Sequence, residues 1–215
     1  MKTNNLLKNV ILILVIAMAA TNSKADNYYS ILDSGVLTIY YGTPTTTQQG
    51  LHTYYNLSAN MNYQFATADY AQHINKVVID RSMRNHQPSG INYWFRNLQN
   101  LEEVTGLGFI STTNITILDA MFDYCINLRD IEFTSTYSGV IYRFQTSGIT
   151  SMFGMFSNCK SLRTLDLSTF DTQNVTRTAT MFQYCSSLQT ILAFEKSMPC
   201  LSMRRTVCIE SAFIW

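Results

Sequence analysis

The segment MFSNCKSL, residues 155–162, decides how this chain folds, because similar segments stand before and after it. Each copy begins with two large apolar residues, carries an anchor residue at its fifth position and ends in Leu. The other copies are WFRNLQNL at 94–101, MFDYCINL at 121–128 and MFQYCSSL at 181–188. Their Phe residues lie 27, 34 and 26 positions apart, a period typical of a solenoid that alternates a strand with a short helix. The sequence therefore predicts a repeat protein.

The residues around each eight-residue block predict the elements of one coil. Three threonines precede the later blocks at a position suited to helix N-caps, namely Thr116, Thr150 and Thr176. Apolar residues then recur at helical spacing, so we expect one side of a two-turn helix to face inward. After each block, alternate apolar residues predict a short strand whose inward members are Ile131 and Phe133, Leu165 and Leu167, and Ile191 and Ala193. One coil alone leaves both of its faces open, so the coils must stack.

The first 25 residues have the order of a secretory signal peptide. Lys2 and Lys8 lead into an uncharged apolar stretch from Val10 to Ala20, and small residues precede the end of the segment. The apolar stretch has 11 residues, whereas a spanning helix needs about 20. We therefore expect cleavage after Ala25, a secreted or cell-surface location and no integral membrane segment after cleavage.

Charge argues against a nucleic-acid partner. Removing residues 1–25 takes away three of the 15 Lys and Arg and leaves 12 basic against 14 acidic side chains, a net charge of −2. Such a balance does not attract phosphate backbones. The remaining residues are numerous enough for one domain with a substantial core.

Two further regions are expected to flank the repeats. Residues 26–70 contain two alternating apolar segments joined by a turn at Asp33–Gly35 and a further extended segment, which predicts a β-rich N-terminal cap. The solenoid itself is expected at residues 71–193. Residues 194–215 hold no further block and form either an irregular C-terminal cap or the end of a truncated array.

The five cysteines divide into two groups. Cys125, Cys159 and Cys185 occupy the anchor position of successive blocks, so we expect a column of small buried thiols. Cys200 and Cys208 lie outside the blocks. A local disulfide between them would require their Cα atoms to lie about 4.4 to 6.8 Å apart.

Catalytic signals are weak. The three histidines, His52, His73 and His86, precede the blocks and have no partner at metal-ligand spacing, so we interpret them as surface or loop residues. No GxSxG nucleophile elbow occurs in the sequence. We therefore expect no catalytic, cofactor or metal site.

The last repeat carries a resemblance to a known family. Residues 165–188 resemble the repeat LDLSxFDTxxVTxMxxMFxxCxxL of BspA-like leucine-rich-repeat surface proteins almost throughout, departing at Thr178. The segment Lys76–Asp80 followed by Pro88, and the strand Gly35–Tyr41, are also similar to parts of that family. The resemblance implies an α/β leucine-rich-repeat solenoid of about four coils. It also implies an exported or surface-displayed protein of host-associated bacteria, some of which adhere to host matrix, host cells or other bacteria.

One insertion is the main candidate for contact with a partner. The stretch Thr134–Ser147 adds about eight residues between the second and third blocks and is either a bulged structural loop or an exposed aromatic contact site. Outward strand positions are the other candidates. The candidate partner-contacting residues are Tyr137, Tyr142, Phe144, Glu132 and Asp166. The expected function is binding or adhesion to a protein or glycan, and the alternative is an exported hydrolase or an inhibitor of a host enzyme.

Overall fold

The computed structural model describes residues 27–42, 52–57, 65, 70–193 and 207–208. The expected signal peptide at residues 1–25 lies outside the described residues, and so does the tail apart from positions 207 and 208. The side chains of Cys200 and Cys208, and with them the disulfide considered above, also lie outside this part.

Most of the regular structure is short β-strand. The strands are β1 (Asn27–Asp33), β2 (Val36–Gly42), β3 (His52–Leu57), β4 (Lys76–Ile79), β5 (Glu103–Thr105), β6 (Asp130–Ile131), β7 (Thr134–Tyr137), β8 (Val140–Arg143), β9 (Thr164–Asp166), β10 (Thr190–Leu192) and β11 (Val207–Cys208). Short 3-10 helices are η1 (Ala71–His73), η2 (Arg81–Asn85) and η3 (Leu107–Phe109). The sheets run in the orders β3-β1-β2-β4-β5-β6, β11-β10-β9 and β7-β8.

The first two strands form the hairpin that the sequence predicts near the N-terminus. β1 and β2 pair antiparallel up to Asp33 opposite Val36, so only two residues make the turn. These residues, Ser34 and Gly35, have positive φ values of 49° and 86°. Two consecutive left-handed residues are typical of a tight type I′ turn. β3 lies against the other edge of β1.

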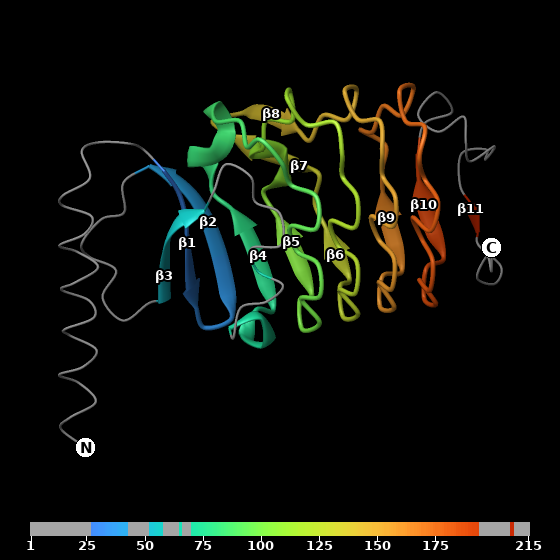
Figure 1. The fold of residues 1–215 in the computed structure, drawn as a ribbon, viewed down its shortest axis with the longest axis horizontal. Helices are drawn as coiled ribbons and strands as arrows, with labels where there is room; N and C mark the ends of the chain where they lie inside the picture. Colours follow the sequence, from blue (N-terminus) through green and yellow to red (C-terminus); the bar gives the residue numbers. More distant parts are fainter. Residues whose placement is uncertain (1–26, 43–51, 58–64, 66–69, 194–206, 209–215) are drawn as a thin grey trace, which may run out of the picture.

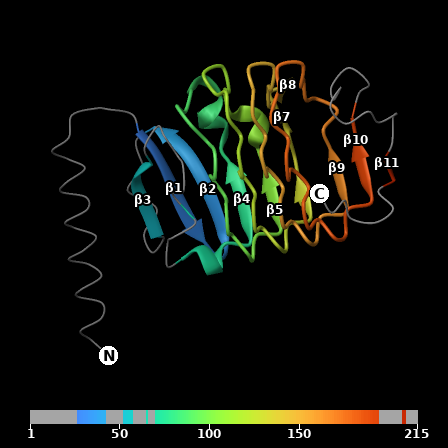
Figure 2. The ribbon, with the colours of Figure 1, turned by 45° about the vertical axis from the view of Figure 1, so that its right-hand side comes forward.

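The hairpin continues into a parallel sheet to which successive repeats contribute one strand each. β2 pairs with β4, β4 with β5, and β5 with β6, all in parallel, and β9 pairs in parallel with β10. These strands lie side by side along the long axis of the molecule (Figures 1 and 2). In β4, Val77 and Ile79 are buried while Lys76 and Val78 are partly exposed, as the alternation of strand side chains requires.

The blocks are chains of turns, and the short helices predicted for them are wrong. Around each block, two residues four positions apart have positive φ, a left-handed conformation that interrupts a right-handed helix. These pairs are Tyr93 and Asn97, Ala120 and Tyr124, Gly154 and Asn158, and Thr180 and Tyr184. Between them, N–H groups bond to carbonyls three residues back, as from Asp123 to Ala120.

From Leu118 to Tyr124, alternate N–H groups bond to the next repeat. The Ala120 N–H donates to the Phe153 carbonyl at 2.8 Å, and the Phe122 N–H donates to the Met155 carbonyl at 2.9 Å. The same pattern links the third block to the fourth. An α-helix would use nearly all of its N–H groups internally, whereas these turns leave every second one for the neighbouring repeat.

The threonines expected to cap helices also join successive repeats. The Thr150 hydroxyl donates to the Thr116 carbonyl at 3.1 Å, and the Thr176 hydroxyl donates to the Thr150 carbonyl at 3.3 Å. Their backbone N–H groups donate to the same two carbonyls. The capping role is therefore wrong, because the segment that follows each threonine forms turns.

One phenylalanine per block forms a continuous stack through the core. The ring centroids of Phe122 lie 5.6 Å from those of Phe95 and Phe156, and the Phe156 and Phe182 centroids lie 5.7 Å apart. Phe65 adds a ring 6.1 Å from Phe95 at the N-terminal end of the stack. All of these rings are fully buried except Phe182, which is partly buried at the other end. The stacking expected of equivalent side chains is confirmed.

Replacing Phe122 by Ala is expected to lower the free energy of unfolding by about 3–5 kcal/mol, because the substitution empties a buried position between two rings. Phe153→Ala is the matched control, since Phe153 is 38% exposed, and it is expected to cost about 1 kcal/mol or less. Urea denaturation of both variants measures the difference. Equal losses would contradict the importance of the stack.

A turn and a helix at Tyr184 predict opposite orders of stability for its Gly and Ala variants. Tyr184 is 60% exposed and has a φ of 61°. Gly adopts this left-handed conformation without a steric penalty, whereas Ala does not. Tyr184→Gly is therefore expected to be more stable than Tyr184→Ala by about 1 kcal/mol in thermal unfolding. A helix would reverse the sign, because Gly in a helix is about 1 kcal/mol worse than Ala.

Candidate contact surface

The insertion Thr134–Ser147, expected from the sequence to be either a bulged structural loop or an exposed aromatic contact site, contains a β-hairpin. β7 and β8 pair antiparallel, and the two-residue turn between them has positive φ at Ser138 (49°) and Gly139 (76°). We call residues 134–143 the inserted hairpin. In Figure 1 it lies near the top of the view, above β5 and β6.

Phe144 cannot contact a partner, which corrects the prediction made for it. Its side chain is fully buried, and its ring lies 5.7 Å from that of Phe133 and 6.2 Å from that of Phe170. The Phe144 N–H donates to the Phe133 carbonyl at 2.9 Å, so both residues close the base of the hairpin. Burial of these rings attaches the insertion to the core of the repeats.

Tyr137 and Tyr142 lie on the inward face of the hairpin and are half-buried. The Tyr142 ring packs against Phe109 of η3 at 5.4 Å. The Tyr137 ring lies under two guanidinium groups of η2, at 4.8 Å from Arg81 and 4.9 Å from Arg84. Both tyrosines therefore help to hold the hairpin on the short helices beneath it.

The most exposed apolar side chains of the hairpin were missed by the sequence reasoning. Val140 is 52% exposed and Ile141 is 54% exposed. The available signal was an aliphatic pair directly after the turn residues Ser138 and Gly139, in an insertion that interrupts the repeat spacing. The aromatic residues of the insertion were predicted to contact a partner instead, although large aromatic side chains are often buried.

The hairpin approaches the main body so closely at Gly108 that no larger residue fits. A Cβ atom at this position would lie 2.5 Å from the Tyr142 carbonyl oxygen and 2.7 Å from the Ser135 nitrogen. Both contacts are to backbone, which cannot rotate away. Gly108 is therefore part of the seat on which the hairpin rests.

Beside this seat lies a groove of about 490 Å³ between β8 and residues 108–113, which we call the arginine groove. Its charged lining residues are Arg84 and Arg143, and the described residues that line it include no carboxylate. Phe109, Ile141 and Tyr142 supply apolar surface. The arginine groove thus combines positive charge with aromatic and aliphatic side chains.

Glu132 and Asp166 line a second groove of about 370 Å³, which opens where β6 and β9 face each other without a shared ladder. Both side chains are exposed. The Asp166 carboxylate accepts a hydrogen bond from the Ser168 N–H at 2.8 Å. The structure thus brings these two predicted residues to one groove, which Thr134, Ser135 and Thr136 of β7 also line.

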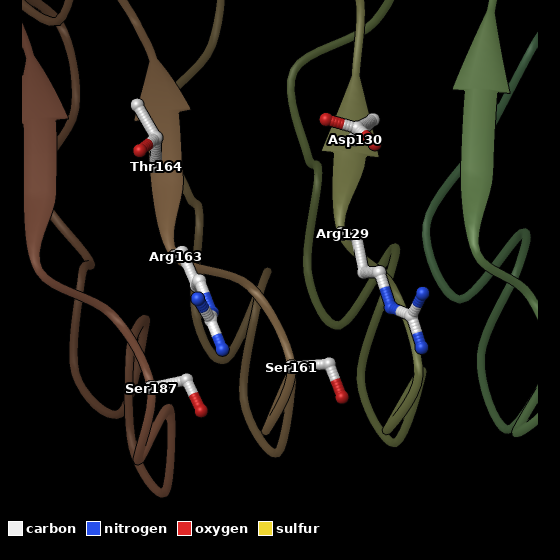
Figure 3. A pocket seen from close by; sticks show the side chains of 6 residues that line it. All are labelled: Arg129, Asp130, Ser161, Arg163, Thr164 and Ser187. Atoms are coloured by element: carbon white, nitrogen blue, oxygen red, sulfur yellow. The ribbon is translucent and has the colours of Figure 1, made fainter.

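A third groove, of about 470 Å³, opens at the same interruption, and we call it the repeat-edge groove. Figure 3 shows its lining, in which the side chains of Arg129 and Arg163 extend in the same direction. Asp130 also lines it, and Arg129 forms an ion pair with Glu102 at 3.6 Å. Positive charge is therefore partly balanced here.

The repeats and the inserted hairpin coincide with a family match. The family described as Mycoplasma protein of unknown function, DUF285, matches residues 89–204, which is more than half of the chain. The chain belongs to this family. No curated protein and no solved structure matches it. Within the described part of this DUF285 member, no helix is long and apolar enough to cross a bilayer.

The DUF285 match includes the column of three cysteines, which the structure confirms as buried and free of disulfides. Each thiol donates to the carbonyl of the Phe in the preceding block, from Cys125 to Phe95 at 3.0 Å, from Cys159 to Phe122 at 3.3 Å and from Cys185 to Phe156 at 3.0 Å. Burial raises the pKa of all three thiols, that of Cys185 to about 12. Since the thiolate is the nucleophilic form, these thiols serve the packing.

Metal binding finds no support in the described ranges, where no three His, Cys, Asp or Glu side chains gather closely enough to hold an ion. Of the histidines, His73 is exposed and His86 is partly exposed, while the side chain of His52 lies outside the described residues.

The three column thiols of the folded DUF285 chain are expected to resist an aromatic disulfide reagent at about pH 8, because raised pKa values leave almost no thiolate. Cys200→Ser and Cys208→Ser, introduced together, remove the other two thiols. Absorbance of the released product should then report three thiols only after denaturant is added. Rapid labelling of the native variant would show that the column is open to solvent.

Proposed function

We propose that this protein is a secreted or surface-displayed binding protein that contacts a host or bacterial macromolecule. Its repeats would form a leucine-rich-repeat-type solenoid of the BspA-like kind, with turns in place of the short helices. One parallel strand per repeat and one stacked phenylalanine per block support that architecture. The resemblance of residues 165–188 to BspA-like repeats supports adhesion as the role.

The observation that carries the proposal is the exposed tip of the inserted hairpin beside the arginine groove. Val140 and Ile141 each expose more than half of their surface. Exposed aliphatic side chains next to a groove are typical of contact sites. This arrangement serves contact rather than bond cleavage, so we prefer binding to the exported hydrolase or enzyme inhibitor considered from the sequence.

The test is a screen of residues 26–215 on immobilised matrix proteins, glycans and bacterial surfaces. At least one ligand is expected to bind, and Val140→Ser with Ile141→Ser should weaken that binding about tenfold by removing the exposed tip. Ile117→Ser is the matched control, since Ile117 is 41% exposed and lies outside the hairpin. It should leave binding within about twofold.

Binding to nothing in this screen, together with cleavage of a substrate in a general hydrolase panel, would refute the binding role in favour of the enzymatic alternative. Binding that responds equally to the hairpin substitutions and to Ile117→Ser would refute the hairpin as the contact. Circular dichroism of each variant shows whether the fold is retained.

A further inference from the structure

We propose that the arginine groove docks a segment of an acidic partner protein, with carboxylates on Arg84 and Arg143 and an apolar side chain against Phe109, Ile141 and Tyr142. This inference rests on the proposed binding function and specifies the chemistry of the partner. The groove lies between β8 and residues 108–113, and its volume of about 490 Å³ suits a few side chains of a peptide.

Positive charge gathers at this place in a chain that is otherwise nearly balanced, with 15 basic and 14 acidic side chains. Among the described residues, the ion pairs engage Lys76, Arg96, Arg129 and Arg177. Arg81, Arg84 and Arg143, all at the hairpin or directly beneath it, make no ion pair within that part of the chain. A partner's carboxylates would supply the missing counter-charges.

The guanidinium groups of Arg81 and Arg84 are held in place before any partner arrives. Arg84 donates through Nη1 to the Arg81 carbonyl at 2.9 Å and lies over the Tyr137 ring. Arg81 lies over the same ring at 4.8 Å. Two positive charges that share one ring repel each other at this range, and a nearby anion relieves the repulsion. A fixed guanidinium also loses less side-chain entropy when it binds a carboxylate.

The apolar lining favours a peptide over a sulfated polysaccharide. Ile141 is 54% exposed, and the tilted ring pair of Phe109 and Tyr142 adds aromatic surface to the same groove. A polysaccharide presents hydroxyls and sulfates, which gain little from aliphatic surface. A peptide can place an aliphatic or aromatic side chain between two acidic ones, so it uses both features of the lining.

The repeat-edge groove in Figure 3 provides an internal comparison. It also contains two arginines, Arg129 and Arg163, but Asp130 lines it and Glu102 neutralises part of the charge on Arg129. A carboxylate entering there would meet like charge. Substitution of Arg163 is therefore a matched control, because it removes an exposed arginine from a groove that should not bind the acidic segment.

The experiment uses residues 26–215 and three short fluorescent peptides in an anisotropy titration. The first peptide places Phe and Leu among Asp and Glu, the second replaces the acids by Asn and Gln, and the third replaces Phe and Leu by Ala. The first peptide should bind. The other two should bind at least about tenfold more weakly, since the second lacks the carboxylates and the third lacks the large apolar side chains. Raising the salt concentration should weaken the first peptide's binding.

Variants connect the binding to the groove. Arg84→Gln and Arg143→Gln should each weaken the first peptide about tenfold, because each removes a charge-assisted hydrogen bond. Arg163→Gln should leave the affinity within about twofold. Gly108→Ala should also weaken binding by displacing the hairpin, and an unchanged circular dichroism spectrum would separate this effect from unfolding.

Equal binding of the first and third peptides, or tighter binding of heparin than of the first peptide, would overturn the inference in favour of a general polyanion site. No binding of the first peptide would overturn it as well. If the screen of the proposed function still yields a ligand in that case, the binding role stands and only the acidic-segment chemistry fails. If the screen is also empty, both fail together.

Discussion

The structure depends on one constraint, which is that each repeat completes its hydrogen bonds and its core only through its neighbours. Every second N–H from Leu118 to Tyr124 donates to the next repeat, and the thiol of each column cysteine donates to the preceding repeat. The phenylalanine stack spans the same interfaces at spacings of 5.6 to 5.7 Å. Because no repeat covers its own faces, equivalent residues must remain in register, and the recurrence of the block follows from that need.

The inserted hairpin shows how such an array accommodates extra residues. The spacing between block phenylalanines rises from 27 to 34 residues at the insertion and then returns to 26. The turn side of the repeats keeps its ladder across this point, from residues 118–124 to residues 151–157. The strand side does not, since β6 and β9 share no ladder in the described chain. The second and third grooves open at that interruption, so the irregularity of the array also produces these two grooves.

Sequence reasoning succeeded where a pattern had only one structural meaning. Alternation around Val77 and Ile79 predicts a strand, and the repeated Phe and Cys positions predict buried columns. It failed where one pattern had two meanings. Apolar residues such as Leu118, Met121, Phe122 and Cys125 suit an inward helix face, but a chain of four-residue turns also returns side chains to the same side. The left-handed conformations at Ala120 and Tyr124 distinguish the turns from a helix. Ala and Tyr rarely adopt this conformation, so the sequence does not predict it.

The sequence by itself determined that this is a repeat protein with a shared dry interior. The apolar side chains of the blocks recur at regular spacing, and a single repeat could not bury them without its neighbours. It also located the insertion and the outward positions of Glu132 and Asp166. Only the tertiary structure decided which residues of the insertion face solvent. Phe144 is buried against Phe133 and Phe170, and Tyr137 has two guanidinium contacts, whereas Val140 and Ile141 remain exposed. The side chains that bury Phe144 and Tyr137 either lie far away in the sequence or are reached only because the hairpin lies over η2 and η3. The local sequence therefore does not show which residues of the insertion are buried.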